Sequence, residues 1–363
     1  MQYADFRLTL KTQLTIALLT LVMAGVPVRT SAQAVNENGI LPYGTYHGGD
    51  IDQVSLSNGH INIRIPIKDY PQRGGRLKLT FIVRYNNLLW NQTQSCVPGA
   101  PICIYQWNPG VPSGVQFGVE QAPPSFTQHC IYGCNSSSPV FAYAMVMPDG
   151  SERPLGNTSG TLYESLDATG LRMDVQSGNT ALADGTRYTF QSGGNAVMED
   201  TNGNQIFFTG STIGDTLGRN IPVSASSTTS DFTGCTGLLP ISSASLWIVP
   251  GSNGANETFK FCYAEVTIFT NHHFSGANCR QPNQCIQING QYSMLQSIVQ
   301  PDGTAWTFDY SQPDSTGVNW GDLVKIALPT GGSISYTWGS RRRLLEALRP
   351  SRINQRAGSD AEC

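Results

Sequence analysis

A recurring phrase constrains the fold of this chain more than any other feature of its sequence. Turn-forming residues that end in glycine open each copy, and alternating aromatic residues follow in the longer ones. Proline presets the second position of a turn, glycine adopts the conformation that closes it, and period-two alternation is typical of half-buried strands. The copies occupy residues 148–150, 184–190, 200–208, 301–310 and 329–338. Each predicts one hairpin, so we expect an all-β protein of antiparallel β-hairpin repeats with very little helix.

The first 34 residues have the pattern of a secretory signal peptide. Arg7 and Lys11 give a positive start, residues 14–26 are an apolar run short for a membrane span, and Pro27 ends that run. Cleavage is expected after Ala34, with an uncleaved anchor as the alternative. Because no later segment is long and apolar enough to cross a bilayer, the mature chain is predicted to be secreted or held at the cell surface without a transmembrane span.

Charge and composition limit the kinds of binding partner that we expect. The chain has 22 Lys and Arg against 25 Asp and Glu, a net charge of −3, so it lacks the basic surplus that nucleic-acid binding requires. Charged residues make up only 13% of the chain while hydrophobic residues make up 39%, which argues against disorder. A surface glycan or another protein is the predicted kind of partner, and no nucleic acid is expected.

Eight of the nine cysteines agree with export, because disulfides persist in oxidising compartments. Proximity in the sequence predicts the pairs Cys96–Cys103, Cys130–Cys134, Cys235–Cys262 and Cys279–Cys285, although proximity does not fix the connectivity. Metal binding or free thiols are the alternative. His272 and His273 lie near the last pair, but their spacing fits no established zinc module. We therefore predict no metal and no cofactor.

The cleanest strand pair comes early. Residues 60–67 place isoleucines at every second position, and residues 77–85 repeat the alternation after a polar loop. This pattern predicts a half-buried antiparallel hairpin. Pro66 lacks an N–H donor, so the first strand should be an edge or pair on one side only at that point. His60 falls on the polar face, where a surface position is expected rather than a catalytic base.

Together these features resemble the Rhs/YD-repeat family of large exported proteins. Residues 52–87 are similar to the stretch that opens such repeat regions, and residues 184–190, 200–208, 215–219 and 302–310 are similar to single repeat units. The matching motifs of the opening stretch are Ser57-Asn58-Gly59, Ile65-Pro66-Ile67, Arg73-Gly74-Gly75 and Tyr85-Asn86-Asn87. The resemblance implies a β-hairpin ribbon of the kind that winds into a hollow shell. Since the chain has neither cap nor effector domain, it implies an N-terminal or truncated part, with further repeats as a partner.

The predicted organisation has seven segments. They are a signal peptide (1–34), an opening β-hairpin (35–90), a disulfide-pinned insertion with β-sandwich-like character (91–139), a β-repeat region (140–223), a linker and cysteine-bearing β region (224–294), YD/Rhs-like repeats (295–340) and a basic disordered tail (341–363). A basic tail that binds acidic glycans, lipid or nucleic acid is the alternative for the last segment.

No motif predicts an enzyme. No serine has the glycine pattern of a nucleophile elbow, and most aspartates stand in turns, where their side chains cap backbone amides. The predicted function is a non-enzymatic scaffold or surface-interaction protein, with no catalytic residue. The first alternative is a secreted carbohydrate-binding adhesin that stacks sugars on Trp90, Tyr105, Trp107 and Trp320. The second is a secreted hydrolase. Asn91, Asn135, Asn157 and Asn256 are glycosylation sequons if the producing cell glycosylates.

Overall fold

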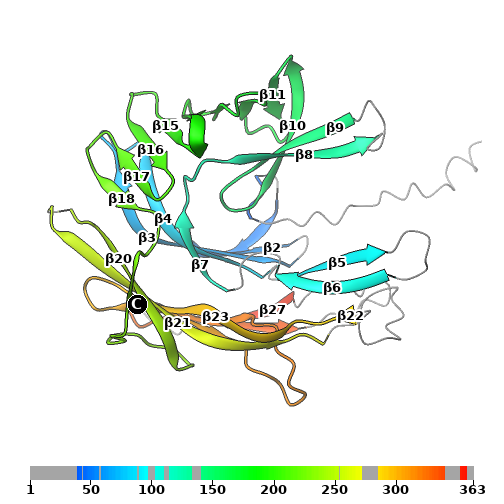
Figure 1. Ribbon diagram of the computed structural model, residues 1–363, viewed down its shortest axis with the longest axis vertical. Coiled ribbons are helices and arrows are strands. Elements are labelled where there is room, and N and C mark those ends of the chain that lie inside the picture. Colours follow the sequence, from blue (N-terminus) through cyan, green and yellow to red (C-terminus); the bar gives the residue numbers. More distant parts are fainter. Residues whose placement is uncertain are drawn as a thin grey trace, which may run out of the picture. The chain divides into compact units, whose positions relative to one another are not determined.

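The structure is a computed structural model, and it confirms the predicted all-β class. It describes residues 39–42, 44–56, 59–87, 90–96, 103–109, 114–132, 140–252, 254–271, 285–339 and 352–357. Within these residues the only helical element is a 3-10 turn at Ser192–Gly194. No helix in the described part has the length and apolar character needed to cross a membrane. Nearly all strands belong to three antiparallel sheets, which are labelled in Figure 1.

The first sheet, here the opening sheet, contains the predicted early hairpin. Its order is β1-β2-β3-β4-β7. The strands are β1 (Tyr46–Gly48), β2 (Asp52–Ser55), β3 (Ile61–Pro71), β4 (Lys78–Asn86) and β7 (Gln116–Val119). Ile63 lies opposite Tyr85 and Ile65 opposite Val83, and all four are buried. The period-two alternation therefore gave the correct strands and the correct buried face.

Pro66 has no N–H to donate to a neighbouring strand, and the sheet leaves one side of β3 unpaired at this residue. Strand β2 pairs with β3 only from Ile61 to Ile63, so at Pro66 the strand pairs with β4 alone. A bulge follows between Pro66 and Lys68. The prediction of one-sided pairing at Pro66 is confirmed.

The second sheet, the meander sheet, has 11 strands in strict chain order from β8 to β18. Its strands are β8 (Ser125–Tyr132), β9 (Val140–Val146), β10 (Glu152–Ser159), β11 (Leu162–Ser165), β12 (Arg172–Asp174), β13 (Thr180–Ala181), β14 (Arg187–Phe190), β15 (Ala196–Glu199), β16 (Gln205–Thr209), β17 (Thr212–Asp215) and β18 (Asn220–Pro222). Each strand pairs with the next along the chain, so the whole sheet is a series of consecutive hairpins. Strands β7 and β8 both begin within the segment predicted as an insertion.

The third sheet, the C-terminal sheet, has eight strands, again nearly in chain order. Its strands are β19 (Ser227–Thr229), β20 (Ile241–Pro250), β21 (Asn256–Phe269), β23 (Asn289–Val299), β24 (Ala305–Tyr310), β25 (Leu323–Ala327), β26 (Ser333–Gly339) and β27 (Arg352–Ala357). Strand β27 pairs with β26 and lies within the segment predicted as a disordered tail. Those six residues are therefore extended and paired.

A small sheet joins the two cysteine-bearing stretches. Strands β5 (Trp90–Cys96) and β6 (Cys103–Pro109) form a hairpin, and β22 (Cys285–Ile286) pairs parallel to β6 (Figure 1). The hairpin register sets Cys96 opposite Cys103, as their predicted pairing requires of the backbone.

One predicted disulfide is confirmed directly. Cys235, in the loop before β20, is bonded to Cys262 of β21, with a Cα–Cα distance of 6.0 Å. Cys262 is fully buried, so the bond fixes a surface loop to the C-terminal sheet. Cys285 is disulfide-bonded as well. Cys134 and Cys279 lie outside the described residues.

Aspartates close the turns in a single repeated way. The side chain of each accepts a hydrogen bond of 2.8–3.1 Å from the backbone N–H two residues later. The residues that do so are Asp149, Asp167, Asp174, Asp184, Asp200, Asp215, Asp231, Asp302 and Asp314. In the Pro-Asp-Gly copies the glycine has positive φ, +82° at Gly150 and +85° at Gly303. The turn chemistry predicted from the sequence is confirmed.

The three large sheets share one core. Trp247 of β20 is fully buried against Phe81 and Phe117 of the opening sheet, with ring centroids 4.6 and 4.8 Å away. Its indole N–H donates to the carbonyl of Pro222 in the meander sheet at 2.8 Å. Tyrosine hydroxyls make further links between sheets, for example from Tyr70 to the Pro250 carbonyl at 2.9 Å. Aromatic packing and buried hydrogen bonds thus hold the sheets together.

Candidate functional site

The predicted sugar-stacking residues fall in two places. The ladder of β5 and β6 sets Trp90 opposite Pro109, Gln94 opposite Tyr105 and Gln92 opposite Trp107, without a bulge. Since facing residues share a side of a ladder, the positions of Trp90, Tyr105 and Trp107 belong to one face of this hairpin. Trp320 does not join them in this hairpin. It lies before β25, half-buried and packed against the shared core.

The histidines give no metal site among the described residues, where no group of three or more His, Cys, Asp or Glu side chains is placed to hold an ion. His272 and His273 lie outside the described residues. His60 corrects one expectation, because it is 6% exposed and not a surface residue. The face that it shares with Asn62 is covered, since the Asn62 side-chain amide donates to the Gly39 carbonyl at 3.1 Å. The polar side of a strand is not always its solvent side.

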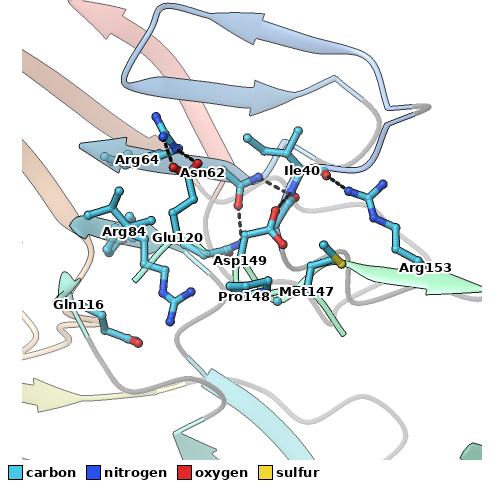
Figure 2. A pocket seen from close by; sticks show the side chains of 16 residues that line it. Ile40, Asn62, Arg64, Arg84, Gln116, Glu120, Met147, Pro148, Asp149 and Arg153 are labelled. Carbon is cyan, nitrogen blue, oxygen red and sulfur yellow. Dashed lines mark hydrogen bonds and ion pairs between the residues drawn. The ribbon is translucent and has the colours of Figure 1, made fainter. Parts of the chain in front are cut away.

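The candidate site is a cavity of about 370 Å³ on the outer face of the opening sheet. Its floor is the face of β3, β4 and β7 that points away from the shared core. Its other wall comes from Gly39, Ile40 and the β9–β10 turn, residues 147–150, together with Arg153 of β10. Apolar side chains such as Ile40 and Met147 line it together with polar and charged ones, which are more than half of the lining residues (Figure 2). Small-molecule sites commonly have this size.

Local sequence explains how the floor acquires its charges. Inward positions of β3 and β4 are isoleucine, valine and aromatic, so the alternate positions carry Asn62, Arg64, Arg84 and Asn86 outward. Register then places Arg64 directly opposite Arg84, and Arg84 opposite Gln116 of β7. Two like charges directly opposite each other are unfavourable unless a counter-charge intervenes.

Glu120 supplies that counter-charge to Arg64 alone. It accepts hydrogen bonds from Nε and Nη2 of Arg64, each at 2.5 Å, in a two-pronged ion pair. This bond is the main reason why the pKa of Arg64 is raised. On the opposite wall, Arg153 pairs with Asp167 at 3.4 Å and donates to the Ile40 carbonyl at 3.3 Å. Two of the three arginines in the cavity are therefore partnered.

Both carboxylate oxygens of Asp149 also accept hydrogen bonds. Its Oδ2 accepts from the Ile40 N–H at 2.9 Å, and its Oδ1 accepts from the N–H and the hydroxyl of Ser151 at 2.9 and 2.7 Å. The carboxylate thus holds the β9–β10 turn closed and fastens the chain at Ile40 over the cavity (Figure 2). Its charge still acts on Arg84 through space.

Arg84 differs from the other two arginines. Its Nη1 is buried and has no hydrogen-bond partner among the described residues. Figure 2 shows its guanidinium extending from β4 without a bond to the other side chains drawn. Burial lowers the pKa of Arg84, while the Asp149 charge raises it, and the net shift is downward. The Asp149 charge therefore does not compensate for the hydration that the guanidinium has lost.

Sequence reasoning did not single out the cavity residues. Arg64 and Arg84 interrupt alternating apolar strands, which marks them as outward-facing and, in most sheets, solvated. The covering wall comes from Gly39, Ile40 and the β9–β10 turn, far away in the chain. Only the pairing of charged residues on adjacent strands could have drawn attention to this face.

No protein-family model matches the chain, and no curated protein matches it significantly.

Proposed function

We propose that this chain is an exported, non-enzymatic β-repeat scaffold or surface-interaction protein, the front part of a longer Rhs/YD-repeat-like protein. Support for the repeat architecture comes from the meander of consecutive hairpins with its uniform aspartate turns. Support for export comes from the signal-like first 34 residues and from the disulfides.

One observation carries the proposal: successive repeat turns contact the loop of the opening hairpin in order. Arg76 donates to the Asp184 carbonyl at 3.0 Å, and Asn204 donates to the Arg73 carbonyl at 3.0 Å. Arg219, at the next turn on the same edge, donates to the Pro71 carbonyl at 2.9 Å. The β3–β4 loop and the end of β3 thus bind three alternate turns of the meander sheet, those between β13 and β14, β15 and β16, and β17 and β18. These turns lie at the same end of the strands.

This arrangement is what a scaffold needs at its start. A free row of hairpin turns has no partner for its outward polar groups, whereas here the opening hairpin supplies one for three of the turns, those at Asp184, Asn204 and Arg219. Gln72 adds a further contact, donating to the Asp215 carboxylate at 3.0 Å. The turn aspartates already accept bonds from their own backbone, so their role is structural. We therefore assign no catalytic residue.

Replacing Asn204 tests the scaffold role of the loop. Asn204→Ala removes the bond to the Arg73 carbonyl and also the 2.8 Å bond to the Asp200 carboxylate. Amide exchange in β15–β18 should accelerate at least about fivefold, because one hydrogen bond contributes roughly 1 kcal/mol. Asn157→Ala is the matched control, since Asn157 donates only to the neighbouring Gly160 carbonyl, at 2.8 Å. Unchanged exchange in β15–β18 would contradict a guiding role for the loop.

Export and the absence of catalysis have separate tests. In a secretion-competent host the chain should leave the cytoplasm with Val35 as its first residue, and retention with an intact N-terminus contradicts export. The exported chain should show no turnover on ester, peptide and glycoside substrates. Turnover abolished by a single carboxylate substitution would instead establish the hydrolase alternative.

The carbohydrate-binding adhesin is a second candidate, favoured by the shared face of Trp90, Tyr105 and Trp107. A glycan array should then show binding that Trp107→Ala abolishes, because stacking on an aromatic ring needs the ring. Trp306→Ala, in β24 of the C-terminal sheet, is the control. No binding above background would exclude this candidate.

A further inference from the structure

The geometry points to the cavity around Arg84 as a binding site for a small organic acid, whose carboxylate pairs with the Arg84 guanidinium. The apolar part of the lining would contact the rest of the molecule. This assignment is independent of the scaffold proposal, since it rests on the outer face of the opening sheet and the scaffold proposal rests on the β3–β4 loop.

The first step is the unused donor. A guanidinium carries five N–H donors, and a buried charged donor left without a partner is strongly unfavourable. Arg84 Nη1 is buried and unpartnered among the described residues, whereas Arg64, directly opposite, binds Glu120 through Nε and Nη2. A ligand with acceptor atoms would supply bonds that the described residues do not give to the Arg84 guanidinium.

The second step is the room that the sheet leaves for the guanidinium. The neighbouring strand β7 has Gly118 beside it, and a Cβ at that position would lie 3.4 Å from Arg84 Nη2. A larger side chain at residue 118 would therefore occupy the space next to the guanidinium. Glycine therefore leaves this flank of the guanidinium unfilled, and Arg84 is one of the residues that line the cavity.

The third step is the charge of the ligand. The pairs Arg64–Glu120 and Arg153–Asp167 are each neutral, which leaves Arg84 as the remaining cation and Asp149 as the remaining anion of the lining. The groups that donate to Asp149 are neutral and do not remove its charge. A phosphate dianion would bring two charges close to Glu120 and Asp149 for one guanidinium. A carboxylate brings one charge, and its two oxygens match the arginine fork. The site therefore favours a monoanion.

The fourth step is size. A cavity of about 370 Å³ lies in the range of small-molecule pockets, roughly 300–1,000 Å³, and is larger than a bare acetate ion requires. The lining includes polar side chains besides Arg84, which is compatible with a ligand that has further polar groups. A sugar acid has a carboxylate, hydroxyl groups and an apolar ring face, so we take a hexuronic acid as the probe.

Calorimetry with the purified chain tests the site. Glucuronate should bind, and glucose, which differs by the carboxylate, should bind at least about tenfold more weakly, as expected for loss of a charge-assisted bond. Arg84→Gln and Arg84→Met should each lose at least about tenfold in affinity. The control is Arg172→Gln, which removes an arginine whose side chain is 72% exposed on β12 and should leave binding unchanged.

Folding of the variants is checked by urea unfolding. Arg84→Met should keep or raise the midpoint, because it removes a buried cation that has no partner. Absence of glucuronate binding to the native chain would overturn the proposal. So would phosphate binding as tightly as glucuronate, retained affinity in Arg84→Gln, or an equal loss in Arg172→Gln.

Discussion

Trp247 offers the sharpest test of whether the three large sheets form one cooperative unit. Its ring is fully buried against Phe81 and Phe117 of the opening sheet and Phe259 of its own sheet. Its N–H donates to Pro222 of the meander sheet. A tryptophan buries roughly 150–250 Å², which at about 25 cal/mol per Å² corresponds to about 4–6 kcal/mol. Trp247→Ala should therefore cost about 4–5 kcal/mol of unfolding free energy.

Trp247→Phe separates packing from hydrogen bonding. The phenyl ring keeps most contacts but leaves the Pro222 carbonyl without its donor and part of the volume unfilled, so about 1.5–2 kcal/mol is expected. Trp306→Ala is the control, since Trp306 is only half-buried against the core, and should cost less than Trp247→Ala.

The assay is urea unfolding followed in parallel by far-ultraviolet and near-ultraviolet circular dichroism. One transition should appear in both signals and move to lower urea in the order Trp306→Ala, Trp247→Ala. Two separated transitions, only one of which moves in Trp247→Ala, would refute the shared core. A cost below about 1.5 kcal/mol for Trp247→Ala would refute the magnitude.

Two further predictions concern the disulfide and the turns. Because Cys235 and Cys262 are 27 residues apart, the double variant Cys235→Ala/Cys262→Ala should lose about 3.5 kcal/mol, measured by guanidinium unfolding, and a loss under about 1 kcal/mol contradicts this. Hydrogen bonds from the Thr304 and Thr316 hydroxyls and N–H groups lower the pKa of Asp302 and Asp314. Their contribution to stability is present above the unfolded-state pKa, about 3.9, and is lost as the pH falls through the lower folded pKa. Asp302→Asn/Asp314→Asn should flatten the fall in unfolding midpoint below pH 4, and an unchanged slope excludes these groups.

The sequence predicted the elements whose conformation is determined by residues close to one another in the chain. The opening hairpin follows from the alternation of isoleucines, since a one-residue slip would expose the whole apolar face. The turns follow from Pro-Asp-Gly, because proline, the aspartate carboxylate and glycine each act within four residues. The pairing of Cys235 with Cys262 agreed with proximity because the segment between them is one hairpin, formed by β20 and the first half of β21, which brings the chain back beside Cys235.

Elements that depend on distant partners were not predictable. Strand β7 has four residues, and only its pairing with β4 makes it a strand. The parallel pairing of β22 with β6 joins two stretches that are far apart in the chain. His60 and Arg84 alternate with the apolar residues and were expected to be solvated, but His60 is buried and Arg84 is half-buried with a buried Nη1. Gly39, Ile40 and the β9–β10 turn face Arg84 across the cavity. The period-two alternation predicts which side of a strand each residue faces. Whether that side is buried depends on which other segments pack against it.

The charged groups of the described residues differ in whether their hydrogen-bond donors and acceptors already have partners. The turn carboxylates accept bonds from their own backbone, and Glu120 and Asp149 are occupied as well, so their capacity to act on a substrate is already committed. Arg84 is the opposite case, a buried donor without an acceptor. A ligand for this part of the chain should therefore supply acceptors and negative charge. It follows that a search for ligands should begin with organic acids and with the outer face of the opening sheet, and that the turn aspartates should be studied for stability.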